Sequence, residues 1–245
     1  MARATGRILI VVTSHDTLGD TGRRTGFYYE ELAAPYNAFT DAGYAVDIAS
    51  IRGGKAPFDP TSLSSEGGRP PAVDRFLNDR AAVDKIERTL PIDRVDAADY
   101  DAVFLPGGYG TMWNLPTNAA LARLIEAAFR EGKVIGAVCH GVAGLLSARA
   151  PDGTPLVMGR RVNAFTDAEE EAVGLTEAVP FLLESRLREL GAAFEGGPNF
   201  QAYVVRDGNL VTGQNPQSSA VVAEEVLAAL RDQGLGTPRL RQSVG

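Results

Sequence analysis

The stretch from Lys133 to Leu146 constrains the fold of this chain most, because it joins an apolar run to a cysteine and then to small residues. Val134 to Val138 are apolar or small, which is typical of a short strand buried on both faces. The residues that follow are compatible with a helix. Cys139 is therefore expected on a strand-to-helix turn, at the carboxyl end of a buried strand.

A turn of this kind is a nucleophile elbow, which lifts its central side chain out of the sheet toward the first N–H groups of the helix. It tolerates only small residues two positions away on either side, and Ala137 and Gly141 meet that demand. Helix N-terminal N–H groups favour an anion, so we expect the Cys139 thiol to ionise more readily than a free thiol. The sequence thus predicts a thiolate nucleophile.

The alternative is that Cys139 is a small core residue, since free cysteine is among the most buried residue types. Three features favour a nucleophile. Cys139 is the only cysteine among 245 residues, and it stands where open α/β sheets bind their ligands. A histidine, His140, follows it directly.

Charge and composition exclude several classes of protein. The formal net charge is −7 and the basic residues form no long run, which argues against a nucleic-acid partner. No apolar stretch approaches the roughly 20 residues that span a bilayer, and the start lacks a signal-peptide core. We therefore expect no membrane partner and a cytoplasmic location. One cysteine and two histidines offer no disulfide framework and no usual zinc spacing, so we expect no metal. No Gly-x-Gly-x-x-Gly turn opens a helix after the first strand, so we expect no nicotinamide cofactor either.

Apolar runs alternate with helical patterns along the chain, which predicts an α/β fold. Further strands are expected at 7–13, 45–50 and 101–105, extended chain at 156–164, and a hairpin with a type I′ turn at 206–209. Helices are expected from Pro35 to Gly43 and at 73–90, 121–129, 181–190 and 220–230. These elements predict one flavodoxin-like domain at 1–233, with a mostly parallel sheet, helices on both faces, an inserted region at 51–95 and a flexible tail at 234–245.

Glycines supply a candidate oxyanion site. Gly107, Gly108 and Gly110 follow the predicted strand at 101–105, and their N–H groups are candidates to hold a developing negative charge. Glycines also serve tight turns that bind nothing.

Acidic residues supply candidate bases. Glu30 and Glu31 lie just before the helix predicted at Pro35, where the helix dipole alone makes acidic side chains common. A second acidic cluster at 167–171 is equally compatible with a solvated face.

Five ordered motifs cover nearly the whole chain: Thr25-Gly-Phe with Glu31 and Pro35, Pro106-Gly-Gly-Tyr-Gly-Thr-Met-Trp, Ala137-Val-Cys-His-Gly, Phe165-Thr-Asp-Ala-Glu-Glu, and Thr212-Gly-Gln-Asn-Pro. Together they resemble the DJ-1/PfpI superfamily, and within it the Hsp31-like branch of glutathione-independent, glyoxalase III-like enzymes.

The resemblance implies a role for each candidate residue. In this family the glutamate four residues before the helix proline points at the thiol, which selects Glu31 over Glu30. The residue after the cysteine is the family's histidine, here His140. The candidates for the acidic residue that orients this histidine are Asp167, Glu170 and Glu171. We favour Glu170.

The resemblance also implies a function. It predicts a cofactor-free homodimeric enzyme that converts a small carbonyl substrate, a 2-oxoaldehyde such as methylglyoxal, to D-lactate through a hemithioacetal on Cys139, with Glu31 or His140 as the base. Alternatives in the family are a redox-responsive chaperone or stress protein, and a deglycase or hydratase acting on another small carbonyl. A glutamine amidotransferase is excluded, because it needs a histidine late in the chain and none follows His140.

Overall fold

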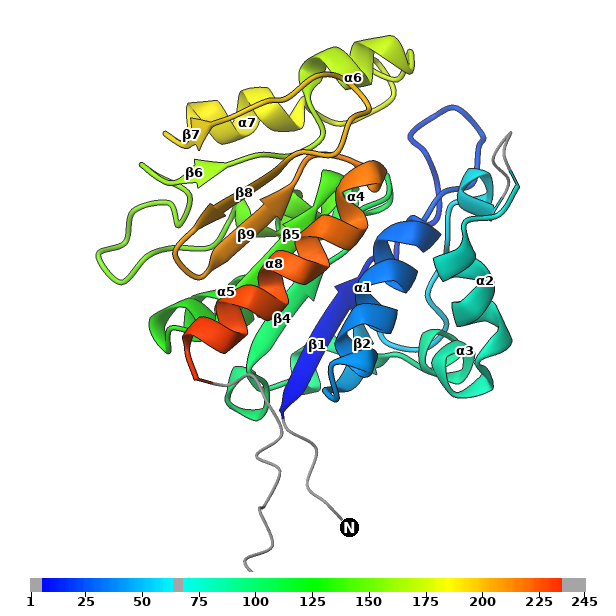
Figure 1. Ribbon diagram of the computed structural model, residues 1–245. Coiled ribbons are helices and arrows are strands. Elements are labelled where there is room, and N and C mark those ends of the chain that lie inside the picture. The colour runs from blue at the N-terminus through cyan, green and yellow to red at the C-terminus, as the bar shows by residue number, and fades with distance from the viewer. Residues whose placement is uncertain (1–5, 64–67, 235–245) are drawn as a thin grey trace, which may run out of the picture.

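The structure is a computed structural model that describes residues 6–63 and 68–234 (Figure 1). Its strands are β1 (Arg7–Val12), β2 (Ala45–Ser50), β3 (Leu90–Pro91), β4 (Ala102–Leu105), β5 (Val134–Val138), β6 (Arg161–Val162), β7 (Ala193–Phe194), β8 (Val204–Asp207) and β9 (Leu210–Gly213). Its α-helices are α1 (Tyr29–Asp41), α2 (Pro71–Asn78), α3 (Arg80–Glu87), α4 (Thr111–Asn114), α5 (Ala119–Arg130), α6 (Asp167–Ala172), α7 (Leu183–Glu189) and α8 (Ser219–Asp232). Of the tail predicted at 234–245, only Gly234 falls within the described residues, so the boundary at 233 stays a prediction.

Seven strands form one sheet in the order β3-β2-β1-β4-β5-β9-β8, and β6 pairs with β7 in a separate two-stranded sheet. In the large sheet every pairing is parallel except that of β8 with β9. The central order β2-β1-β4-β5-β9 is that of flavodoxin-like folds, whose ligands bind at the carboxyl ends of the strands. The predicted mostly parallel α/β fold is confirmed.

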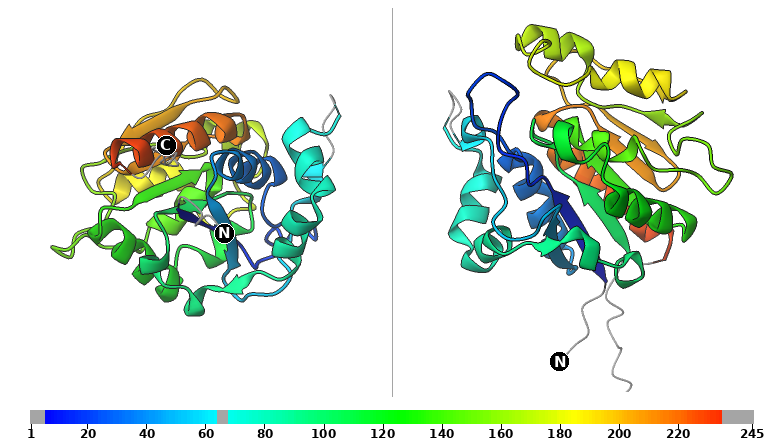
Figure 2. Two further views of the ribbon diagram at one scale, coloured as in Figure 1. Left: turned by 60° about the horizontal axis from the view of Figure 1, so that its bottom comes forward. Right: turned by 180° about the vertical axis from the view of Figure 1, so that it is seen from behind.

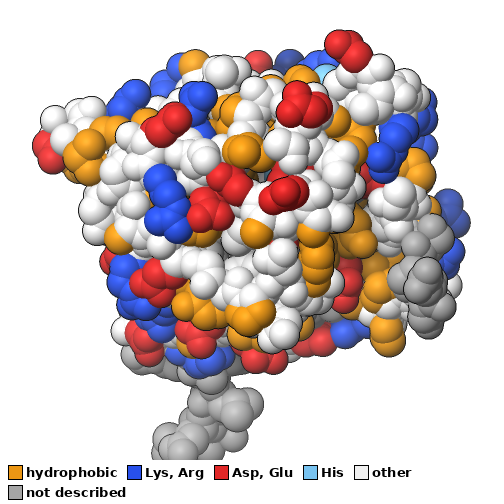
Figure 3. Space-filling model, turned by 90° about the horizontal axis from the view of Figure 1, so that it is seen from above, with side chains coloured by type: hydrophobic (Ala, Val, Ile, Leu, Met, Phe, Trp, Pro, Cys, Tyr) orange, Lys and Arg blue, Asp and Glu red, His pale blue; other side chains and the backbone are white. Residues whose placement is uncertain are grey.

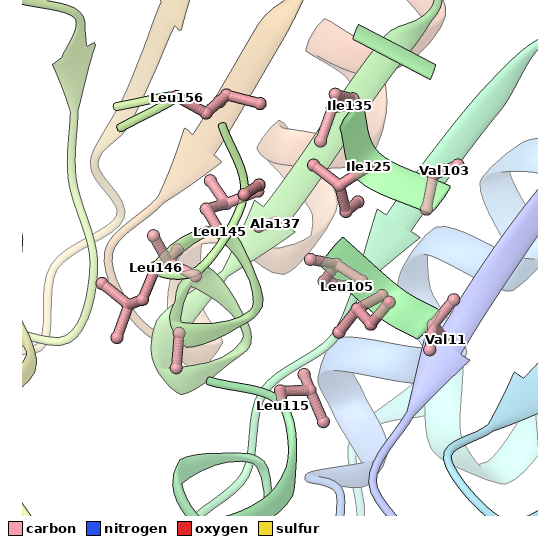
Figure 4. Close-up of a cluster of buried hydrophobic side chains, with 14 of the residues drawn as sticks. Val11, Val103, Leu105, Leu115, Ile125, Ile135, Ala137, Leu145, Leu146 and Leu156 are labelled. Atoms are coloured by element: carbon pink, nitrogen blue, oxygen red, sulfur yellow. The ribbon is translucent and has the colours of Figure 1, made fainter. Parts of the chain in front are cut away.

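Helices cover both faces of this sheet, because alternate side chains of each strand point to opposite sides. Val11 of β1 belongs to a buried cluster that includes Ile125 of α5 (Figure 4). Its neighbour Ile10 belongs to a second cluster, with Phe39 of α1 and Val226 of α8. Figure 1 shows α1 and α8 on the near face, and the view from behind in Figure 2 shows α5 on the other.

The helix predicted at 73–90 is two helices, α2 and α3. Asp79 separates them, because its carboxylate accepts hydrogen bonds from the N–H groups of Ala81 and Ala82 and so caps α3. Both helices belong to the predicted insertion at 51–95. The two views of Figure 2 show this region beside α1, at the edge of the molecule.

Helix α1 begins at Tyr29, earlier than predicted, so Glu30 and Glu31 lie in its first turn instead of before it. Pro35 lies inside the helix and has no N–H to donate to the carbonyl of Glu31. The early start places Glu31 on the buried side of α1.

Two smaller predictions are corrected. The hairpin of β8 and β9 forms, but in its turn only Gly208 has a positive φ, of 62°, whereas a type I′ turn requires two such residues. The stretch at 156–164 is a strand only at Arg161–Val162 and is mostly turn before it.

No helix among the described residues has the length and apolarity needed to cross a membrane.

Candidate active site

Cys139 follows β5 directly and opens a 3₁₀ helix, Cys139–Leu145, instead of the expected α-helix. Its φ of 56° is in the left-handed region, which is uncommon for a residue with a side chain and occurs at functional turns. The predicted demand for small neighbours is met at Gly141, where a Cβ would lie 2.2 Å from the carbonyl oxygen of Leu105. The turn therefore packs backbone against backbone beneath a cysteine that is 3% exposed.

Glu31 is fully buried beside the Cys139 thiol. Its Oε2 accepts a hydrogen bond of 2.6 Å from the N–H of Gly107, in the turn that follows β4. Its Oε1 has no hydrogen-bond partner within the described part of the chain. Burial raises the pKa of this carboxyl to about 8, although interactions with Cys139 and the Gly107 N–H oppose the shift. Glu31 can therefore hold or release a proton near neutral pH.

His140 lies on another side of the thiol. Its Nδ1 is 3.3 Å from Sγ of Cys139, and its Nε2 is 2.8 Å from Oε2 of Glu170. The other carboxylate oxygen of Glu170 accepts a hydrogen bond of 2.7 Å from the hydroxyl of Tyr109. When Glu170 is ionised it can only accept, so Nε2 carries the ring proton and Nδ1 is free to accept a proton from the thiol.

The imidazole of His140 is also fixed by two aromatic rings. The ring centroid of Tyr109 lies 4.4 Å from that of His140, and the ring centroid of Phe165 lies 4.6 Å from it. Packing and the hydrogen bond to Glu170 together hold the ring in one orientation. The sequence singled out neither aromatic residue, although Tyr109 lies inside the glycine-rich motif that follows β4.

Of the three acidic candidates, the structure brings only Glu170 to His140. Asp167 begins α6 and accepts a hydrogen bond from the hydroxyl of Ser185, and Glu171 is exposed. Glu169, which the sequence did not single out, is buried and closes a capping box with Thr166 at the start of α6.

The Cys139 thiol does not match the predicted ease of ionisation. Burial raises its pKa above the ordinary value, the negative charge of Glu31 adds to the increase, and the N–H of His140 only partly opposes it. A 3₁₀ helix of seven residues supplies too little dipole to reverse this effect. Because two adjacent buried anions repel each other, Cys139 and Glu31 together carry no more than one negative charge near neutral pH.

Two of the three proposed oxyanion donors are already engaged. The N–H of Gly107 donates to Glu31, and the N–H of Gly110 donates to the carbonyl oxygen of Gly26 at 3.2 Å. The N–H of Gly108 donates to none of the described residues, and Gly108 lines the cavity over Cys139. Of the predicted three, Gly108 therefore remains as a candidate oxyanion donor.

A cavity of about 310 Å³ opens over these groups. It is lined by Arg23, Tyr28, Glu31, Thr61, Gly108, Tyr109, Cys139, His140, Phe165, Val173, Leu175, Phe200, Pro216 and Gln217. Figure 3 looks onto this end of the molecule, where acidic and apolar side chains lie near the middle of the face and basic ones mostly toward its margins. The cavity thus joins a polar reacting end to largely apolar walls.

The described residues contain no group of three or more His, Cys, Asp or Glu side chains arranged to hold a metal ion. His15, the other histidine of the chain, lies outside the cavity lining, stacks on Trp113 with ring centroids 4.9 Å apart, and contacts the carbonyl oxygen of Thr17.

Comparison with known proteins agrees with this geometry. The DJ-1/PfpI family model matches residues 24–229. Glutathione-independent glyoxalase hsp3101 of Schizosaccharomyces pombe is 31% identical over 232 residues, covering 91% of this chain and 95% of that protein. The crystal structure of glyoxalase III from Candida albicans has a TM-score of 0.84 at 28% identity, over 92% of this chain and 98% of that one. The structure of Rapid Encystment Protein 24 KDa from Francisella tularensis has a TM-score of 0.88 at 36% identity, and the match covers 92% of this chain and 99% of that one. The chain belongs to the DJ-1/PfpI family, among relatives that include the Hsp31-type glutathione-independent glyoxalases.

Proposed function

We propose that this protein is a glutathione-independent glyoxalase that converts a 2-oxoaldehyde such as methylglyoxal, with one water, to a 2-hydroxy acid, D-lactate. The observation that carries the proposal is the placement of one thiol between two proton acceptors, Glu31 and His140, at the closed end of a cavity. The names of the relatives hsp3101 and glyoxalase III support the same activity.

The first step is addition of Cys139 to the aldehyde carbon. His140 Nδ1, 3.3 Å from Sγ, takes the thiol proton, and Glu170 stabilises the resulting imidazolium through Nε2. Because His140 takes the thiol proton during the attack, the reaction does not require a thiolate in the resting enzyme. The raised pKa of the thiol therefore does not prevent attack. The N–H of Gly108, a residue of the cavity lining, is the donor that we assign to the oxygen of the hemithioacetal.

The second step moves a proton between two neighbouring carbons. We assign Glu31 as the base that takes the proton from the former aldehyde carbon and returns it to the former keto carbon. Its unpartnered Oε1 and its pKa near 8 support this assignment, since a proton shuttle works best with a pKa close to the working pH. The imidazolium of His140 gives the former thiol proton to the former keto oxygen, so His140 is neutral again. The product is a thioester of the 2-hydroxy acid on Cys139.

The last step is hydrolysis of the thioester, with His140 as the base for water. One carbon is oxidised from aldehyde to carboxylate while its neighbour is reduced from ketone to alcohol. The reaction therefore balances without an external oxidant, reductant, nicotinamide or glutathione, and the proposal includes no metal.

The test is turnover by protein dialysed exhaustively against EDTA and assayed with methylglyoxal alone, with D-lactate measured by a stereospecific assay. We expect one D-lactate for each methylglyoxal consumed, and none from Cys139→Ala protein prepared in the same way. Activity that returns only on addition of glutathione or a metal ion would contradict the mechanism.

We also propose that the protein acts as a homodimer in the cytoplasm. The family resemblance supports the dimer, and light scattering coupled to size-exclusion chromatography measures it. The cytoplasmic location is supported by the single free cysteine, which stays reduced in that compartment.

A chaperone-like role has less support, because only five large apolar side chains of the described residues are exposed, and Val173 and Phe200 among them line the cavity.

A further inference from the structure

Arg23 is the part of the cavity that turnover of methylglyoxal does not use. It is the only lysine or arginine among the described residues that line this cavity. Its guanidinium forms no hydrogen bond or ion pair with any residue of 6–63 or 68–234. Five N–H donors and a full positive charge thus stand at the cavity without a partner among the described residues.

The loop between β1 and α1 holds the backbone of Arg23 in place. The carbonyl oxygen of Arg23 accepts a hydrogen bond of 3.0 Å from the N–H of Leu18, and its N–H donates to Oγ1 of Thr21 at 3.2 Å. Gly22 makes the turn between them possible with a φ of 70°. The loop therefore presents Arg23 from a fixed position.

The next residue in the same loop provides a contrast. Arg24 forms an ion pair with Asp16 at 3.3 Å and does not line the cavity. Arg24 is therefore paired with a carboxylate, whereas Arg23 lines the cavity and has no such pair within the described ranges.

The size of the cavity also exceeds what methylglyoxal requires. About 310 Å³ lies in the range of sites that hold substantial organic ligands, roughly 300–1,000 Å³, whereas methylglyoxal has five non-hydrogen atoms. Phe165, Leu175 and Phe200 give the walls an apolar character. Phe200 has a φ of 58°, and its N–H donates at 2.7 Å to the buried carboxylate of Glu169, which holds this strained residue at the cavity.

We propose that the substrates of this site are 2-oxoaldehydes that carry an anionic group, a carboxylate or a phosphate, at the end remote from the aldehyde, and that Arg23 binds this group. The inference rests on the proposed glyoxalase function. The aldehyde lies at Cys139, the chain of the substrate follows the apolar walls, and the anion pairs with the guanidinium. The bonds made and broken are those of the proposed reaction, and the anionic group is unchanged.

Arg23 also removes an electrostatic obstacle. The site contains the carboxyl group of Glu170, and the chain has a net charge of −7, so an anionic substrate would otherwise be repelled. A guanidinium at the mouth offsets that repulsion along the path of entry.

The test compares substrates that differ in charge but little in shape: 4,5-dioxopentanoate, with a carboxylate, and neutral 2-oxohexanal. A third substrate, 3-phosphooxy-2-oxopropanal, distinguishes phosphate from carboxylate. Initial rates over short times are needed, because 2-oxoaldehydes slowly modify arginine, and intact mass verifies that the recovered enzyme is unmodified. We expect the wild type to favour at least one anionic substrate in kcat/KM, through a lower KM.

Arg23→Ala is expected to reduce the ratio of kcat/KM for the anionic over the neutral substrate by about tenfold, the size expected for a charge-assisted pair. Arg23→Lys should retain part of the preference, and high salt should reduce it in the wild type. The matched control, Arg24→Ala, should leave the ratio unchanged. Equal ratios in wild type and Arg23→Ala, or the same loss in Arg24→Ala, would overturn the proposal.

A binding measurement separates this proposal from the glyoxalase function. Cys139→Ala protein cannot form the hemithioacetal, so calorimetric titration reports recognition alone. We expect 4,5-dioxopentanoate or the phosphate compound to bind this variant more tightly than 2-oxohexanal does, and the advantage to disappear in Arg23→Ala/Cys139→Ala. Neutral substrates that turn over without any anion preference in binding would refute the role of Arg23 and leave the glyoxalase function intact. Selective anion binding without Cys139-dependent turnover would refute the glyoxalase function and leave the role of Arg23 in anion binding intact.

Discussion

The N–H of Gly107 donates a hydrogen bond of 2.6 Å to Oε2 of Glu31, and this bond joins the turn after β4 to the first turn of α1. A Cβ at Gly107 would lie 2.7 Å from the same oxygen, so the approach requires glycine. The N–H of Tyr28 donates back to the carbonyl oxygen of Gly107 at 3.1 Å. The glycine-rich turn therefore positions the buried carboxyl group beside Cys139, and of Gly107, Gly108 and Gly110 only Gly108 has an N–H without an acceptor among the described residues.

Cys139→Ala is expected to abolish turnover of methylglyoxal while the protein remains folded. The sulfur lines a cavity and its removal leaves the surrounding core intact, so the free energy of unfolding should change by about 1 kcal/mol or less. Circular dichroism and thermal unfolding measure the fold, and depletion of methylglyoxal measures activity. Activity that persists in the folded variant would refute the assignment of the nucleophile.

Glu31→Gln is expected to lower kcat by about 10²–10⁴-fold, the usual contribution of a general acid-base group. Because the amide cannot move the carbon-bound proton, the hemithioacetal should accumulate, and intact mass should rise by one methylglyoxal. Glu30→Gln is the matched control, since Glu30 is the preceding residue of the same helix and is absent from the cavity lining. Similar losses from both variants would show that the shuttle is not Glu31.

Glu170→Gln is expected to reduce kcat more than it raises KM, because Glu170 positions His140 and has no place in substrate binding. The amide cannot stabilise the imidazolium that forms when the thiol ionises, so the pH profile of kcat/KM should shift together with the loss of rate. Glu171→Gln, at the exposed neighbouring position, should behave as the wild type. An unchanged pH profile in a slow Glu170→Gln protein would assign Glu170 a purely structural role.

The features that could be predicted from sequence are those set by neighbouring residues. The apolar run of β5 and the small residues around Cys139 determine a buried strand and a tight turn, and both are present. The turn is predicted to require a small residue at position 141, and the structure gives the reason, because the carbonyl oxygen of Leu105 lies too close for a Cβ on Gly141. The alternation of strands and helices likewise determined the fold class.

The features that could not be predicted depend on contacts between distant segments. Asp167, Glu170 and Glu171 share one short helix, and only its orientation against β5 decides which of them reaches His140. The pKa of Cys139 likewise depends on burial against Glu31, which sequence spacing does not reveal. Arg23 and Arg24 have the same chemistry, and only the path of the loop decides that Arg24 pairs with Asp16 while Arg23 lines the cavity.

The stability of the protein is expected to depend on pH through Glu31. The pKa of this carboxyl is raised from 4.5 to about 8 by burial in the folded protein. Between these two values the folded state holds a proton that the unfolded chain has released, so the free energy of unfolding falls as pH rises. The stabilisation is fully present below pH 4.5 and is lost as pH passes through about 8.

Glu31→Gln cannot titrate at this position, so the difference in unfolding free energy between wild type and variant isolates the effect from all other groups. We expect this difference to fall by about 1.4 kcal/mol per pH unit inside that window, the linkage value for one proton, and to level off outside it. Urea denaturation at a series of pH values measures it. The same comparison in a Cys139→Ala background removes the thiol, so a slope that survives there belongs to Glu31. Parallel curves for the two proteins would mean that Glu31 is ionised throughout this pH range and that burial does not raise its pKa.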